Sequence, residues 1–181
     1  MKHFCLLLIA ICLLFFSCRN KTDYSKEIFR LDSAKVVLLS AEKNLLSVDT
    51  SMLRSSYNSC AENLHSIMEK LSKDTVKKRT AIFLSDAYEQ SGNILNLLDN
   101  KKYLERALIE SQQRISDLKH DLTEDLIEKN KSDAYVVNEM NASQKIYEAV
   151  SKVIEKAKNS SAKLDSLKIQ ISFIADSLKL K

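Results

Sequence analysis

Two pairs of a carboxylate and a histidine have the spacing that metal chemistry in a helical protein requires. Glu62 lies three positions before His65, and Asp117 lies three positions before His120. Residues three apart share one face of a helix, so each pair could hold a metal ion from the inside of a bundle. The apolar residues around both pairs, however, predict that all four side chains face solvent. We therefore expect no metal site at these positions.

Other catalytic and binding chemistries lack the residues that they need. The chain has no Cys-x-x-Cys pair and too few histidines for a zinc site, and Gly92 is its only glycine, so it has no glycine-rich phosphate loop. The basic run Lys77-Lys78-Arg79 has no interleaved aromatic residues for base stacking, and no Ser-His-Asp arrangement stands out. We therefore expect a protein that is not an enzyme and that binds neither a cofactor nor nucleic acid.

The N-terminal segment has the composition of an export signal. A short basic start, Lys2 and His3, precedes the apolar run Phe4–Phe16, and polar residues follow from Arg19 onward. As a helix the apolar run would be about 20 Å long, which is too short for a hydrocarbon core of about 30 Å. A basic start, a short apolar run and a small residue at its end are typical of a cleaved signal peptide.

The end of this segment, Phe15-Phe16-Ser17-Cys18, resembles the lipobox of bacterial lipoproteins, with Phe15 where Leu is commonest. The resemblance implies that residues 1–17 are removed and that Cys18 carries a diacylglyceryl group and a further acyl chain such as palmitate. Two or more acyl chains anchor a protein stably to a membrane. Arg19, in the place of an inner-membrane Asp signal, favours the outer membrane, with the body in the periplasm or at the surface.

Two other interpretations of the segment stay open. It could be an ordinary signal peptide cut near Ser17, with Cys18 incidental, or a retained membrane helix. Loss of residues 1–17 removes Lys2 and no acidic residue, so the net charge falls from +4 to about +3, too small to indicate a nucleic-acid partner. Cys60 is then the only cysteine besides Cys18, so we expect no disulfide within the chain.

The composition predicts an all-α fold, because the 181 residues include no proline and one glycine. We expect a tether at residues 18–25 and one helical-bundle domain at 26–181. The expected helices are 24–47, 51–72, 75–99, 101–128 and 132–180, with Asp74 and Ser132 as caps. The apolar positions shift phase between Leu98 and Leu104. Either a new helix begins near residue 100 or one overwound helix continues, which the helix-forming residues on both sides favour.

Apolar residues recur at alternating steps of four and three, the heptad pattern of helices that pack knobs into holes. In the second helix this seam consists of Leu53, Tyr57, Cys60, Leu64, Ile67 and Leu71. In the last helix it consists of Ile146, Val150, Val153, Ala157, Ser160, Leu164, Leu167, Ile171, Ile174 and Leu178. The last helix would be about 73 Å long. We therefore expect an elongated antiparallel bundle or coiled-coil hairpin with a long C-terminal helix.

These observations favour a membrane-anchored, non-enzymatic envelope lipoprotein that acts as a structural or protein-interaction module. Its expected partners are membrane lipid through Cys18 and either an envelope protein or a second copy, bound through the coiled-coil seams. A ligand-binding or sensory helical module in the periplasm is the alternative. The terminal Lys181 also resembles the end of the small murein lipoprotein, which implies a possible link to peptidoglycan.

Four short segments resemble the Asp-Ser/Thr-aliphatic motif of O-glycosylated envelope proteins. They are Asp32-Ser33-Ala34, Asp74-Thr75-Val76, Asp165-Ser166-Leu167 and Asp176-Ser177-Leu178. Such short patterns also recur by chance in helices rich in Ser and Asp. Whether they are glycosylated stays open at this point.

Overall fold

The computed structural model describes residues 21–71 and 78–179, and within these ranges the chain forms helices and no strand. The helices are α2 (Ser25–Leu46), α3 (Thr50–Leu71), α4 (Lys78–Thr123) and α5 (Lys129–Lys179). The predicted all-α class and the long C-terminal helix are therefore confirmed. At 51 residues, α5 is about 77 Å long. The expected Asp74 cap lies outside the described residues.

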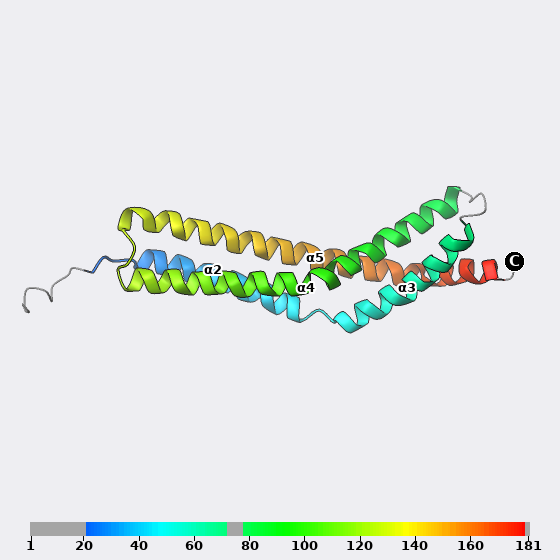
Figure 1. The fold of residues 1–181 in the computed structure, drawn as a ribbon, viewed down its shortest axis with the longest axis horizontal. Helices are drawn as coiled ribbons and strands as arrows, with labels where there is room; N and C mark the ends of the chain where they lie inside the picture. The colour runs from blue at the N-terminus through cyan, green and yellow to red at the C-terminus, as the bar shows by residue number, and fades with distance from the viewer. Residues whose placement is uncertain (1–20, 72–77, 180–181) are drawn as a thin grey trace, which may run out of the picture.

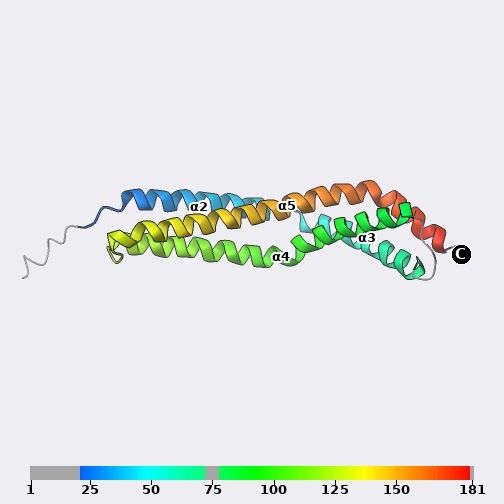
Figure 2. The same ribbon diagram turned by 90° about the horizontal axis from the view of Figure 1, so that it is seen from above.

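The molecule is a rod built on the antiparallel hairpin of α4 and α5 (Figure 1). Helices α2 and α3 follow one another along this hairpin; each packs against both α4 and α5, and they do not pack against each other. The rod thus consists of two consecutive three-helix bundles that share one hairpin (Figure 2). The start of α2 lies beside the turn between α4 and α5, and the end of α5 lies at the opposite tip.

The predicted seams of α3 and α5 face the interior of the rod. Every described member is buried or half-buried, including Ser160, the polar member of the α5 seam. The side chain of Leu178 lies outside the described part of the chain. Burial of apolar side chains stabilises a fold by about 25 cal/mol per Å². The two seams therefore stabilise this arrangement together with the inner faces of α2 and α4, which bury their own apolar residues.

Residues 78–123 form one continuous helix, so the separate helices 75–99 and 101–128 are not observed. The expected phase shift is also absent. Leu97 is completely buried whereas Leu98 is only partly buried, so the inward positions run from Ile94 through Leu97 to Leu104 in heptad register. Leu97 and Leu98 are adjacent and of the same type, so the sequence alone does not indicate which of them faces the core.

The turn between the last two helices comes earlier than the sequence predicts. Helix α4 ends at Thr123, not at 128, because Asp125 adopts a left-handed conformation with φ 57°. The Leu126 amide donates to the Asp121 carbonyl (2.8 Å) and the Asp125 amide to the Leu122 carbonyl (3.2 Å). This is the Schellman arrangement that ends many helices.

The predicted cap at Ser132 is therefore wrong. Ser132 lies in the first turn of α5, fully buried, and its hydroxyl donates to the Lys129 carbonyl (2.9 Å). Leu126, which follows the end of α4, is exposed. The N-cap of α3 is Asp49, whose Oδ1 accepts the Ser51 and Met52 amides at 2.9 and 3.0 Å.

A chain of hydrogen-bonded polar side chains crosses the interface of α4 and α5 in the interior of the rod. The buried Ser160 hydroxyl donates to Gln90 Oε1 (2.9 Å), and Gln90 Nε2 donates to Asp86 Oδ1 (2.8 Å). At the surface, Lys163 lies 3.9 Å from the same Asp86 oxygen. Because a buried amide must find its partners, this layer favours one register of α5 against α4 over a shift by a heptad.

We predict that Ser160→Ala destabilises the protein by about 1–3 kcal/mol, because it leaves the buried Gln90 carbonyl without a donor. The free energy of urea unfolding measures this. The matched control is Ser166→Ala on the same helix, which removes an exposed hydroxyl bonded to its own backbone and should have little effect. The double variant Ser160→Ala/Gln90→Leu should recover most of the loss. Equal stability of the wild type and Ser160→Ala would show that the layer does not stabilise the fold.

Candidate functional site

Cys18, the residue with the clearest predicted chemistry, lies outside the described residues. The structure does show how the chain that follows it joins the bundle. Five residues meet at this end of the rod, from the start of α2 and from the α4–α5 turn. We call this group, which consists of Asp23, Tyr24, Glu27, Ile127 and Lys129, the N-terminal cluster.

Lys129 is at the centre of the N-terminal cluster. Its ammonium donates to the Asp23 carbonyl (2.7 Å) and to Glu27 Oε1 (2.7 Å), and it lies 4.6 Å from the centre of the Tyr24 ring. The Tyr24 hydroxyl donates to the Ile127 carbonyl. A single lysine thus joins a backbone carbonyl, a carboxylate and an aromatic face. With the Tyr24 hydroxyl bond, four contacts fix residues 23–27 to the turn.

Glu27 is the charged residue of this cluster that the fold buries, with 7% of its surface exposed. The hydrogen bond from Lys129 holds the pKa of Glu27 below its ordinary value of 4.5, although burial opposes this. The carboxylate is therefore ionised at neutral pH and paired with the lysine. Its second oxygen has no hydrogen-bond partner among the described residues. A buried carboxylate that depends on one cation is sensitive to removal of that cation.

Further polar contacts hold α2 against both arms of the hairpin. Toward α5, Arg30 pairs with Asp133, and toward α4, Lys119 pairs with Asp32. Further along, Gln112 Nε2 donates to Glu42 Oε2 (2.9 Å). Exposed ion pairs contribute little individually, but together they fix the rotation of α2 about its own axis.

Tyr24 and Ser25, which were predicted to belong to the tether at residues 18–25, are therefore part of the folded body. Tyr24 is almost completely buried, and α2 begins at Ser25. The position of Tyr24 on the apolar stripe of the first helix was a usable signal for this. No sequence pattern indicated that Glu27 would be buried and paired, because its partner Lys129 is 102 positions away in the chain.

The two carboxylate–histidine pairs point to solvent, as their seams predicted. Glu62, His65, Asp117 and His120 are all exposed. His65 lies 3.4 Å from Glu69, one turn further along α3, and Asp117 accepts a hydrogen bond from Gln113 (2.7 Å). The described residues contain no group of three or more His, Cys, Asp or Glu that could hold a metal ion.

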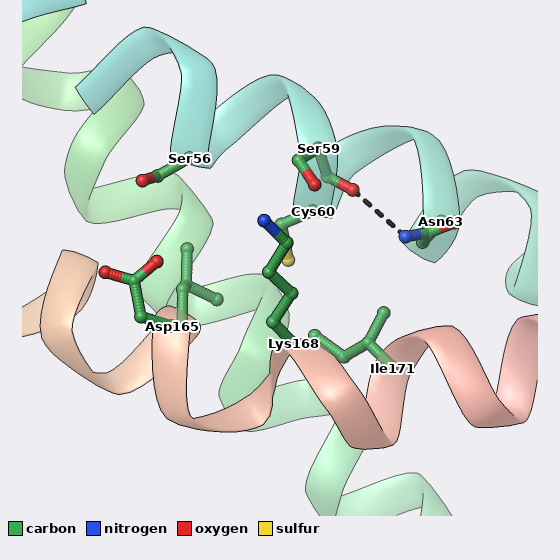
Figure 3. A pocket seen from close by; sticks show the side chains of 8 residues that line it. Ser56, Ser59, Cys60, Asn63, Asp165, Lys168 and Ile171 are labelled. Atoms are coloured by element: carbon green, nitrogen blue, oxygen red, sulfur yellow. Dashed lines mark hydrogen bonds between the residues drawn. The ribbon is translucent and has the colours of Figure 1, made fainter. Parts of the chain in front are cut away.

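Cys60 is a core residue at the interface of α3 and α5. Burial raises the pKa of its thiol, an effect that the Ser91 hydroxyl partly opposes, so the reactive thiolate is disfavoured. The adjacent pocket has a volume of about 20 Å³, enough for one water molecule. In Figure 3, Lys168 extends from α5 across the opening toward α3. We find no basis here for nucleophilic chemistry.

A wider groove runs between α3 and the first part of α4. Its volume is about 640 Å³, within the range of ligand sites, but it is open along its length. Its lining is mainly apolar, with Leu64, Met68, Leu84 and Tyr88, and its polar members include Ser85 and Glu89. Met68 and Tyr88 are exposed on its walls. The size and apolar lining of this groove fit the alternative of a ligand-binding module.

The remaining sequence motifs carry little information at this stage. Ser33 and Ser166 are exposed on helices, with their hydroxyls donating to the backbone carbonyls of Phe29 (3.0 Å) and Lys163 (2.6 Å). The Asp74-Thr75-Val76 motif, the Ser177 side chain and Lys181 lie outside the described residues. Glycosylation of these motifs stays a hypothesis that the intact mass of the protein tests.

Comparison of the chain with family models, curated proteins and solved structures finds no match. None of the helices in the described ranges combines the length and the apolar character needed to cross a membrane.

We predict that Glu27→Gln lowers stability at neutral pH and flattens its dependence on pH in the acid range. Because the pKa of Glu27 is lower in the folded state, the stabilisation by Glu27–Lys129 is complete above about pH 5 and is lost as the pH falls through the folded pKa. Urea unfolding from pH 7 to pH 3 measures this. Glu62→Gln, on the solvent face of α3, serves as the control. Parallel pH profiles for the wild type and Glu27→Gln would contradict the role assigned to the cluster.

Proposed function

We propose that this protein is a non-enzymatic bacterial envelope lipoprotein, anchored through an acylated Cys18, whose helical rod serves as a structural or protein-interaction module. The observation that carries the proposal is the apolar run Phe4–Phe16 followed at once by Ser17 and Cys18 and then by polar residues. Acylation of this cysteine provides the membrane affinity, since two or more acyl chains bind stably. The body is then held in the periplasm or at the surface, with the outer membrane as the favoured site.

The N-terminal cluster, which belongs to the folded part of the protein, also supports this proposal. It fixes Asp23 and Tyr24 to the α4–α5 turn, so only residues 19–22 separate Cys18 from the folded rod. Four residues extend over at most about 14 Å. An anchor at Cys18 would therefore hold the α4–α5 turn next to the membrane surface. The opposite tip of the rod, where α5 ends, could lie about 77 Å away.

We predict that Cys18→Ala abolishes labelling of the protein by a clickable palmitate analogue and shifts it out of the membrane fraction. Cys60→Ala is the matched control, because Cys60 is the other cysteine of the chain after residue 17 and is buried in the core. The control should keep both labelling and membrane association. Labelling of the Cys18→Ala protein, or its full retention in membranes that withstands salt, would refute acylation of Cys18 as the anchor.

A second candidate function, the binding of an apolar ligand, is favoured by the α3–α4 groove. Native mass spectrometry of the purified protein should then show an adduct, and Met68→Glu should remove it. Met52→Glu is the control, because Met52 is an exposed methionine of the same helix that does not line the groove. If the wild type and both variants have the same mass apart from the substitutions, this candidate is wrong.

A further inference from the structure

Helix α2 has a second apolar stripe on the face that points away from the bundle. Its core face consists of Leu31, Ala34, Leu38, Ala41 and Leu45, all buried. Phe29, Val36 and Leu39 each lie two positions before a core residue, and so about 200° around the helix, and Leu46 continues their spacing by seven from Leu39. These four are 72%, 65%, 46% and 63% exposed. A helix that is apolar on two opposite faces is typical of one that lies between two partners.

The outer stripe has a complete heptad register. Phe29, Asp32, Val36, Leu39, Lys43 and Leu46 are spaced by alternating steps of three and four, and all six side chains are exposed. The stripe therefore contains two charged positions of opposite sign among four apolar ones. It spans about 26 Å, or somewhat more than two heptads.

We propose that this stripe, the outer face of α2, binds the same face of a second copy of the chain in an antiparallel two-helix contact. Reversal of the stripe places Phe29 opposite Leu46 and Val36 opposite Leu39 of the second copy, and it brings Asp32 opposite Lys43. Because the contact has twofold symmetry, each of these layers occurs twice. Apolar residues meet apolar ones, and each charge meets its opposite.

The alternative pairings of α2 are unfavourable. A parallel contact in register would place Asp32 against Asp32 and Lys43 against Lys43, two layers of like charge. The flanking positions agree with the antiparallel register, which brings Lys35 toward Glu42 of the second copy, while Ser33 and Ser40 on the other flank are small. Asp32 pairs with Lys119 but keeps 50% of its side-chain surface exposed, and no ion pair within the described chain involves Lys43.

This inference deepens the proposed function, because it identifies the partner as a second copy and the contact as the outer face of α2 rather than the internal seams. It differs from the expectation of self-association through the predicted seams, which the rod uses for its own core. A lipid surface is the other chemistry that an exposed apolar stripe could contact. The alternation of Asp32 and Lys43 favours a protein partner, because an acidic side chain is repelled by anionic lipid.

The test is disulfide cross-linking of full-length chains in cells, in a Cys60→Ser background. Co-expressed Phe29→Cys and Leu46→Cys chains with tags of different size should form a mixed disulfide dimer under mild oxidation. Phe29→Cys alone should form none, because its two copies would be about 25 Å apart in the antiparallel contact. Phe29→Cys with Met52→Cys, an exposed position at the start of α3, is the control for random collision.

A charge exchange provides the second measurement. Lys43→Asp should raise the dimer dissociation constant of the detergent-extracted protein at least tenfold by light scattering, and Asp32→Lys/Lys43→Asp should restore it. Lys26→Asp, an exposed lysine of α2 outside the stripe, controls for net charge. A Phe29–Phe29 disulfide would overturn the antiparallel contact. Labelling of α2 by a photoreactive lipid, with no disulfide in any combination, would overturn the dimer and assign the face to the membrane.

The two proposals fail separately in this experiment. Palmitate labelling is read from the same gel as the disulfide dimer. Labelled Cys18 without the Phe29–Leu46 bond rejects the dimer and leaves the lipoprotein proposal intact. A disulfide between positions 29 and 46 without palmitate labelling supports the dimer and rejects the lipid anchor at Cys18.

Discussion

The structure depends on the need to cover the apolar seam of α5 along its whole length. A 51-residue helix with a continuous heptad seam has no stable existence alone in water, because most helical stability in proteins comes from packing of the apolar face. Helix α4 covers one flank of this seam for most of its length. Among the described helices, neither α2 nor α3 is long enough to cover the other flank alone. Helices α2 and α3 therefore divide it between them, and the break at residues 47–49 is the point where one replaces the other.

Much of this helical arrangement could be predicted from the sequence, because it follows from the spacing of the apolar residues and from the amino-acid composition. The α5 and α3 seams were readable since apolar residues recur every three or four positions, and the absence of proline left nothing to interrupt α4. Two details could not be predicted. The choice between Leu97 and Leu98 rests on which side chain faces the core, and both are leucine. The turn after Thr123 uses a left-handed Asp125 rather than a glycine, so it had no compositional marker.

The candidate site was only partly accessible from the sequence, for a different reason. The lipobox-like segment is local, so its residues are contiguous and visible. The N-terminal cluster, by contrast, joins residues that are far apart in the sequence. Tyr24 and Glu27 contact residues more than 100 positions away, and no short-range sequence pattern predicts those contacts. The outer stripe of α2 could not be recognised from the sequence for another reason. A helix that is apolar on two faces has little amphipathic contrast, so its second face is recognised only after packing has occupied the first.

The anchor, the cluster and the outer face of α2 combine into one geometric account. If Cys18 is acylated as proposed, the cluster would hold the α4–α5 turn at the membrane, and the proposed antiparallel contact would direct the two rods of a pair in opposite directions. Both Cys18 anchors would then reach one membrane only when the rods lie along its surface. Mass spectrometry of the N-terminal peptide of the mature protein tests the proposed acylation of Cys18. A lipid anchor at Cys18 predicts a peptide that begins at Cys18 and carries a diacylglyceryl group, whereas a peptide that begins elsewhere, or at Cys18 with a free thiol, would contradict it.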